Sequence, residues 1–137
     1  MPALYPLPPI VAIHLACAIP ALLLGPVALT VRKGSRLHRA VGYGWVTLML
    51  GAALSAMFIR STALPNLAGF SPIHLLVPVT LLGIGTAIWH VSHGNVLGHQ
   101  RSMRRTYYAG CVVAGLFALL PTRWLGHLVW GQWLGLL

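Results

Sequence analysis

The sequence predicts an all-α protein, an integral membrane four-helix bundle built from two parallel two-helix repeats. Mean hydropathy is +0.82, and only 7% of the 137 residues are charged, against roughly 25% in soluble domains. Four apolar runs approach the ~20 residues that a helix needs to cross a ~30 Å hydrocarbon core. The two halves of the chain also repeat one pattern of histidines, and such a repeat constrains the architecture directly.

Each apolar run is expected to form one transmembrane helix, because a helix satisfies its own backbone hydrogen bonds in lipid and no strand-like alternation is visible. After the fourth run, Pro121 precedes a short apolar tail with three tryptophans, which predicts an interfacial anchor. The chain is thus expected to be a single transmembrane domain, 1–137, with spans at about 10–31, 40–59, 72–90 and 106–119 and an interfacial tail at 124–137.

The repeat pairs the histidines. Ile13-His14-Leu15 recurs as Ile73-His74-Leu75, and Gly34-Ser-Arg-Leu-His38 recurs as Gly94-Asn-Val-Leu-Gly-His99 with one glycine inserted. Spans 1 and 3 run inward and spans 2 and 4 outward, so the two halves are expected to be related by an axis along the membrane normal. His14 would then face His74 near the outer surface, and His38 would face His99 near the inner one.

The basic residues predict the topology. Seven of the nine Lys and Arg residues lie in two stretches, 32–39 and 101–105, and only Arg60 and Arg123 fall elsewhere. Because positively charged loops stay in the cytoplasm, both chain ends are expected on the periplasmic side of a bacterial inner membrane. The net charge of +9 therefore reflects topology and does not predict nucleic-acid binding.

The chain contains no Asp and no Glu, which excludes several kinds of chemistry. Carboxylate proton relays, carboxylate cation sites, paired-acid hydrolysis and serine–histidine–aspartate catalysis all need side chains that are missing. No phosphate-binding glycine loop occurs either. Any chemistry must use histidine, cysteine, arginine or a bound cofactor.

The four repeat-related histidines favour two bis-histidine haem b centres. A haem iron on the axis would take one ligand from each half, with His14 and His74 at the outer level and His38 and His99 at the inner level. The alternative for each histidine is a neutral imidazole bonded to a backbone carbonyl or a hydroxyl. Arginines are expected to pair with the haem propionates; the candidates are Arg36, Arg39, Arg101, Arg104 and Arg123. Topology alone also explains the first four of them.

Glycines and cysteines leave two further alternatives open. Eleven residues make almost three helical turns, which places Gly25, Gly85 and Gly110 on the same helix faces as three of the histidines. Such gaps would leave room for a flat macrocycle, or would serve only helix packing. Cys17 and Cys111, with the outer histidines, offer a Cys₂His₂ site for zinc or copper, or are small apolar fillers. His90, which has no repeat partner, is a reserve candidate for an inner ligand.

Four stretches of the chain resemble the short bacterial members of domain-of-unknown-function family 2306: Lys33-Gly-Ser-Arg-Leu-His38-Arg-Ala-Val-Gly-Tyr-Gly-Trp45, Phe70-Ser-Pro-Ile-His74-Leu-Leu, Gly94-Asn-Val-Leu-Gly-His99-Gln-Arg-Ser-Met103 and Ala114-Gly-Leu-Phe-Ala-Leu-Leu-Pro-Thr-Arg123. The resemblance covers nearly the whole chain and implies a small four-span inner-membrane protein with no established activity. Gln100 stands where arginine is usual, and Thr122 where glycine is usual.

The residues together predict a small di-haem b-type cytochrome that passes electrons across the bilayer. The expected partners are membrane lipid and a quinone or redox protein, within a larger membrane complex or a homo-oligomer. The alternative is a cofactor-free helical accessory subunit that packs against a larger membrane complex through its glycine-rich faces.

Overall fold

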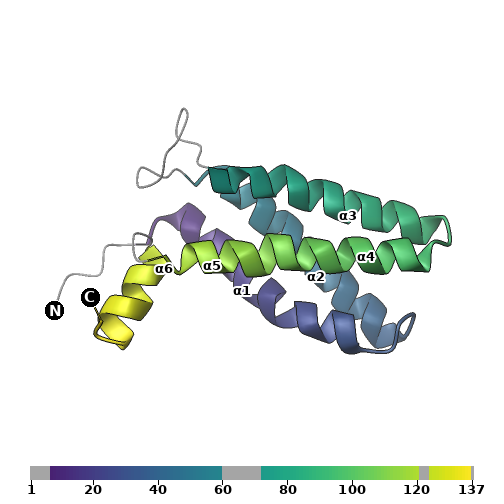
Figure 1. The fold of residues 1–137 in the computed structure, drawn as a ribbon, viewed down its shortest axis with the longest axis horizontal. Helices are drawn as coiled ribbons and strands as arrows, with labels where there is room; N and C mark the ends of the chain where they lie inside the picture. Colours follow the sequence, from purple (N-terminus) through teal and green to yellow (C-terminus); the bar gives the residue numbers. More distant parts are fainter. Residues whose placement is uncertain (1–6, 60–71, 121–123, 137) are drawn as a thin grey trace. The chain divides into compact units, whose positions relative to one another are not determined.

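The structure is a computed structural model that describes residues 7–59, 72–120 and 124–136. Every regular element in these ranges is helical (Figure 1), which confirms the all-α prediction. The chain divides into two compact units, Met1–Ile59 and Arg60–Leu137. Each unit contains one helical hairpin, and each is described by itself.

The first hairpin consists of α1, Pro9–Thr30, and α2, Arg36–Ala56. Small residues let the two helices approach closely: a Cβ added at Gly51 of α2 would lie 2.9 Å from the Cys17 Sγ of α1. The indole of Trp45, only 2% exposed, donates a hydrogen bond of 3.1 Å to the Ala21 carbonyl. The hairpin is therefore held by close packing and by side-chain donors that reach backbone carbonyls of the opposite helix.

The turn of the first hairpin follows from three adjacent residues. Lys33 donates from Nζ to the Ala28 and Leu29 carbonyls, at 3.0 and 2.7 Å, and so satisfies the end of α1. Gly34 has φ of 78°, a left-handed conformation that glycine adopts without steric cost. The Ser35 hydroxyl accepts from the His38 backbone N–H at 3.1 Å and caps α2.

The second hairpin starts with a 3-10 turn, η1, Pro72–Leu75, followed by α3, Leu76–Ser92. Its returning helix is α4, Val96–Tyr107, which continues through a π-helical segment, η2, Tyr108–Val113, into α5, Ala114–Ala118. Gly94 again has a positive φ of 75°, and Asn95 caps α4 by accepting from the Gly98 N–H at 2.8 Å. The turn chemistry of the first hairpin thus recurs in the second.

The buried face of α3 consists of residues at helical spacing: Val77, Thr80, Ile84 and Ala87. A Cβ added at Gly83 would clash with the Thr106 side chain of α4, so these helices also approach closely. Beyond α5, the tail forms α6, Trp124–Gly126, and a π-helical segment, η3, His127–Trp133. The Trp130 indole donates to the Leu119 carbonyl at 2.7 Å, which holds the tail against the end of α5.

Among the described helices, α1 alone is long and apolar enough to cross a membrane, and the apolar α3 is shorter at 17 residues. Helices α2 and α4 begin at 36 and 96, before the apolar runs expected from 40 and 106. The added residues, 36–39 of α2 and 96–105 of α4, include basic side chains, and capping by Ser35 and Asn95 starts each helix directly after its turn. Which helical residues lie in lipid stays a prediction.

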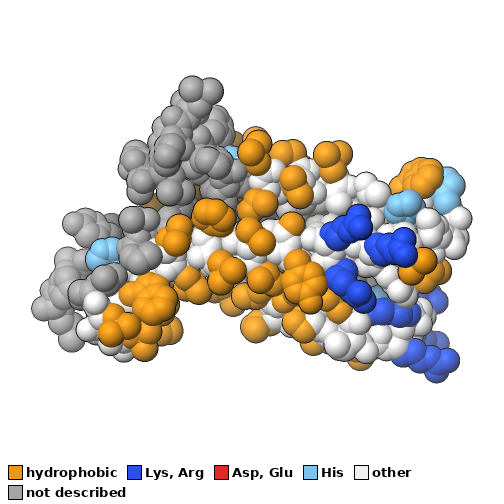
Figure 2. All heavy atoms as spheres, in the orientation of Figure 1, with side chains coloured by type: hydrophobic (Ala, Val, Ile, Leu, Met, Phe, Trp, Pro, Cys, Tyr) orange, Lys and Arg blue, Asp and Glu red, His pale blue; other side chains and the backbone are white. Residues whose placement is uncertain are grey.

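Large apolar side chains are exposed along the length of the helices (Figure 2). Leu23 of α1 is 68% exposed and Leu82 of α3 is 71% exposed. Extensive apolar exposure of this kind is typical of a surface that meets lipid or another protein. Within the described residues, the Lys and Arg side chains gather instead toward the turn end of each hairpin (Figure 2).

Candidate functional site

The two histidines predicted at the inner level make corresponding hydrogen bonds in their own hairpins. His38, the third residue of α2, bonds from Nδ1 to the Ala28 carbonyl of α1 at 3.2 Å. His99, the fourth residue of α4, bonds from Nδ1 to the Ala87 carbonyl of α3 at 2.9 Å. In each hairpin, therefore, a histidine near the start of the second helix is anchored to an alanine carbonyl near the end of the first.

These bonds fix the tautomer of both rings. A carbonyl oxygen only accepts, so Nδ1 must carry the proton and Nε2 is the basic nitrogen of the neutral imidazole. Histidines that ligate metals commonly hold this arrangement, since a hydrogen bond from the other ring nitrogen orients the ring and raises its basicity. Both rings are half-buried.

His14, predicted at the outer level, has the same tautomer. Its Nδ1 donates to the Ala52 carbonyl of α2 at 2.8 Å, with the Ser55 hydroxyl 3.2 Å away. Ser55 donates to the Gly51 carbonyl at 2.7 Å, so its position is fixed as well. His74 is half-buried in η1. The predicted pairs, His14 with His74 and His38 with His99, join residues of the two units and stay predictions.

Four of the five arginines predicted to pair with haem propionates lie within the described residues. Arg36, Arg39, Arg101 and Arg104 are exposed at the turn ends of the hairpins. Arg39 donates to the Gly34 carbonyl at 3.4 Å. Arg123 lies outside the described residues. No side-chain carboxylate exists in the chain to pair with any of these cations.

Gly25 and Gly85, which lie eleven residues after His14 and His74, differ in their surroundings. Gly25 is buried in the first hairpin, whereas Gly85 is exposed and an added Cβ there would meet nothing within 4 Å. Gly25 lies three residues before Ala28, which anchors His38. In the second hairpin, the residue three before Ala87, which anchors His99, is the buried Ile84 and not a glycine. The count from His99 to Gly110 ends inside η2, where i→i+5 bonding changes the helical phase.

Cys111 is buried in η2, and Cys17 is half-buried against α2. Within the described residues, no three His, Cys, Asp or Glu side chains gather in the way that a zinc or copper site requires. That part of the chain therefore offers no support for the Cys₂His₂ alternative.

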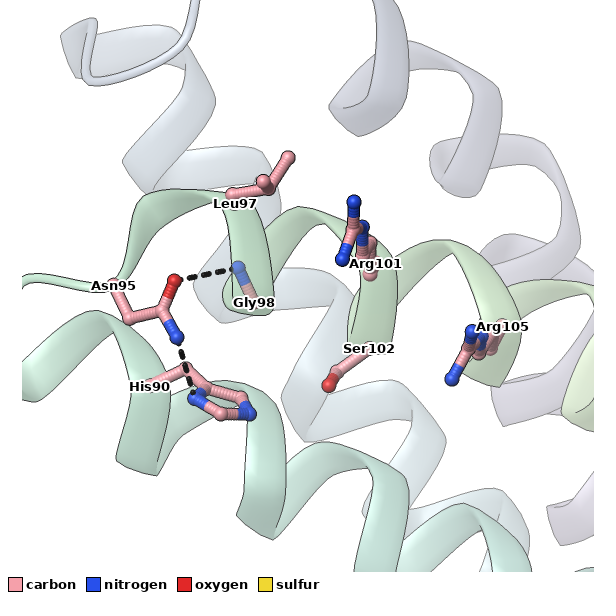
Figure 3. A pocket seen from close by; sticks show the side chains of 7 residues that line it. All are labelled: His90, Asn95, Leu97, Gly98, Arg101, Ser102 and Arg105. Carbon is pink, nitrogen blue, oxygen red and sulfur yellow. Dashed lines mark hydrogen bonds between the residues drawn. The ribbon is translucent and has the colours of Figure 1, made fainter.

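A pocket of about 390 Å³ lies at the turn end of the second hairpin (Figure 3). Its lining residues come from the end of α3, the turn and the first half of α4: His90, Asn95, Leu97, Gly98, Arg101, Ser102 and Arg105. Of the predicted propionate partners only Arg101 lines it; Arg104 does not. The helical spacing of Arg101 and Arg105 was the signal in the sequence that could have identified this surface.

A family model described as "predicted membrane protein", that of domain-of-unknown-function family 2306, matches residues 11–132. Comparisons with curated proteins and with solved structures give no significant match.

Proposed function

Since the chain belongs to domain-of-unknown-function family 2306, a family described as membrane proteins, we propose that it is a small di-haem b-type cytochrome that transfers electrons across the bacterial inner membrane. In this proposal the two hairpins are parallel repeats that together span the membrane four times, with both chain ends periplasmic. His14 and His74 would ligate the outer haem, and His38 and His99 the inner one.

The observation that carries the proposal is the hydrogen bond from Nδ1 to a backbone carbonyl at His14, His38 and His99. Each bond leaves Nε2 as the basic nitrogen, on the side of the ring away from the carbonyl. An iron ligand needs a basic nitrogen on an oriented ring. Three of the four predicted ligands thus have an oriented ring with a basic Nε2. The fourth, His74, is included because it occupies the position of His14 in the repeat.

The spacing of the histidines along the helices also fits two haems. His14 lies fourteen residues before Ala28, the residue that anchors His38, and at 1.5 Å per residue this separates the two levels by about 21 Å. Two levels that far apart suit one cofactor near each face of a ~30 Å hydrocarbon core. The repeat gives the second hairpin the same two levels.

The residues around each haem would bind and orient it. The imidazoles would hold the iron, and exposed arginines such as Arg36 and Arg39 would pair with the propionates. When bound, haem would supply one-electron transfer between a donor such as a quinol or a redox protein at one face and an acceptor at the other. We expect membrane lipid around the bundle and a larger redox complex, or a second copy of the chain, as its partner.

One observation also favours a second candidate, a cofactor-free accessory subunit. The same histidine bonds join the two helices of each hairpin, and the close contacts at Gly51 and Gly83 do so as well. A subunit that only packs against a larger complex would use these contacts for rigidity, and its histidines would need no iron.

The absorbance spectrum separates these candidates. Protein expressed with ample haem supply and purified in detergent should be coloured, and dithionite reduction should produce a split α-band from two b-type haems. A colourless protein with full helical circular dichroism would contradict the cytochrome and favour the accessory subunit.

A further inference from the structure

We propose that the pocket at the α3–α4 turn binds the phosphate group of an anionic membrane lipid. The inference goes beyond the proposed cytochrome function: it uses none of the four histidines assigned to iron, and it assigns Arg101 to a lipid phosphate and not to a haem propionate. It starts from the seven residues that line the pocket.

The pocket presents hydrogen-bond donors from two helices (Figure 3). Arg101, Ser102 and Arg105 lie on one face of α4, at positions i, i+1 and i+4, and His90 approaches from α3. Each arginine carries five N–H donors in a planar fork that suits phosphate. The Ser102 hydroxyl adds a further donor.

His90 is held as a donor toward the pocket by its neighbour Asn95. The Gly98 N–H donates to Oδ1 of Asn95 at 2.8 Å, which identifies the other amide atom, Nδ2, as the one facing His90. Nδ2 donates to His90 Nδ1 at 3.2 Å, so Nδ1 accepts and the ring proton lies on Nε2. This tautomer is the opposite of that of His38 and His99, and it offers an N–H to an anion instead of a lone pair to a metal.

The charges in the pocket call for an anion. Within the described residues, neither Arg101 nor Arg105 has a hydrogen-bond or ion-pair partner, and the chain has no side-chain carboxylate that could supply one. Two like charges one helical turn apart repel each other. A bound lipid phosphate would place a negative charge between them, which offsets their repulsion, and would accept hydrogen bonds from each guanidinium.

The rim of the pocket favours a lipid as the source of the phosphate. Leu97, which lines the pocket, is 56% exposed, and Trp89, whose ring centroid lies 5.3 Å from that of the pocket residue His90, is 57% exposed. Exposed aromatic and aliphatic side chains beside arginines are typical of the level where headgroups meet acyl chains. Basic pockets between membrane helices on the cytoplasmic side bind anionic headgroups, whereas free phosphate gains nothing from an apolar rim.

Native mass spectrometry of the detergent-solubilised protein tests the proposal with three probes: phosphatidylglycerol, phosphatidylcholine and inorganic phosphate. We expect one phosphatidylglycerol to bind more tightly than either of the others. Arg101→Gln and Arg105→Gln should each weaken this binding about tenfold, the loss expected for one charge-assisted contact. Arg104→Gln is the matched control, because it removes the same charge from the same helix outside the pocket and should leave the affinity unchanged.

Two results would overturn the proposal. Equal weakening by Arg104→Gln and Arg105→Gln would show diffuse attraction to a basic helix and no defined pocket. Binding of inorganic phosphate with the same dependence on Arg101 and Arg105, without any preference for phosphatidylglycerol, would exclude the lipid as the ligand. The helical circular dichroism of each variant verifies that the hairpin is folded. Lipid affinity and the haem spectrum are separate measurements, so failure of this proposal is distinguishable from failure of the proposed function.

Discussion

At the scale of single residues, donors that reach a carbonyl of the neighbouring helix join the two helices of the first hairpin. Trp45 is the most buried of these donors, and its indole N–H reaches the Ala21 carbonyl. A buried hydrogen bond of this kind contributes on the order of 1 kcal/mol. The same type of bond anchors His38. A side-chain hydrogen bond to a backbone carbonyl of α1 therefore joins the helices at Trp45 and also orients the proposed ligand at His38.

Trp45→Phe should therefore lower the free energy of unfolding by about 1 kcal/mol or more, because it removes the donor and leaves part of the indole volume empty. The thermal midpoint in detergent, followed by circular dichroism, measures the loss. Trp89→Phe is the control, since Trp89 is largely exposed, and it should leave the midpoint nearly unchanged. Equal midpoints for the two variants would show that the Trp45 contact does not stabilise the fold.

Glycines with a positive φ fix both hairpin turns. Gly34→Ala and Gly94→Ala should each destabilise the protein by roughly 1 kcal/mol, because a side chain is strained in the left-handed region. Gly44→Ala should do the opposite: Gly44 is helical and an added Cβ would meet nothing within 4 Å, so alanine gains about 0.5–1 kcal/mol from helix propensity. Denaturation in a graded detergent–urea series would rank the three variants.

At the scale of elements, each hairpin combines close-approach glycines with open ones, and the two kinds should respond differently. Gly83→Ala should destabilise the second hairpin by about 1–3 kcal/mol, because the new Cβ would clash with Thr106 of α4. Gly85→Ala, two residues along the same helix, has open space in the structure and should be neutral or slightly stabilising. Thermal melts of the two variants make the comparison, and a larger loss at Gly85 would contradict the packing described for α3 and α4.

The sequence predicted the helices well and their finer geometry less well. Apolar runs indicate where helices exist, but residues 36–39 of α2 and 96–105 of α4 are helical and include basic side chains, so the apolar runs do not mark where these two helices start. The π-helical segment at Tyr108–Val113 is not predicted by the apolar run in which it lies. It changes the phase on which the count from His99 to Gly110 depended.

For the candidate site, the sequence predicted which histidines matter but not the hydrogen bonds that orient them. The repeat singled out the histidines, and the alternative to metal ligation, an imidazole bonded to a backbone carbonyl, is the arrangement that the structure has at His14, His38 and His99. The repeat alone does not show that His38 and His99 each donate to an alanine carbonyl near the end of the preceding helix. It also does not show that His90 has the opposite tautomer, since this depends on which atom of Asn95 faces the ring. Arg104 and Arg105 both lie about one turn from Arg101 in the sequence, and only the structure shows that Arg105 lines the pocket with Arg101 whereas Arg104 does not.

At the scale of the whole molecule, the distribution of charge predicts how the chain is inserted. A periplasm-active reporter fused after Leu137 should be active, and the same reporter inserted between Gly94 and Gly98 should be silent, because the basic turns stay in the cytoplasm. Reporter activity in whole cells, normalised to expression, gives the answer. The reverse pattern would invert the orientation and exchange the inner and outer levels of the proposed cofactors.

The claim that named histidines hold two haems is tested most directly by removing them one at a time and recording the reduced-minus-oxidised spectrum of the purified protein. His38→Ala and His99→Ala should abolish the same α-band component, and His14→Ala and His74→Ala should abolish the other. His93→Ala should keep both components, since this exposed imidazole stacks on Trp89 at the turn and has no predicted ligand role. Loss of one shared component from His14→Ala and His99→Ala, or an unchanged spectrum in all four ligand variants, would contradict the account.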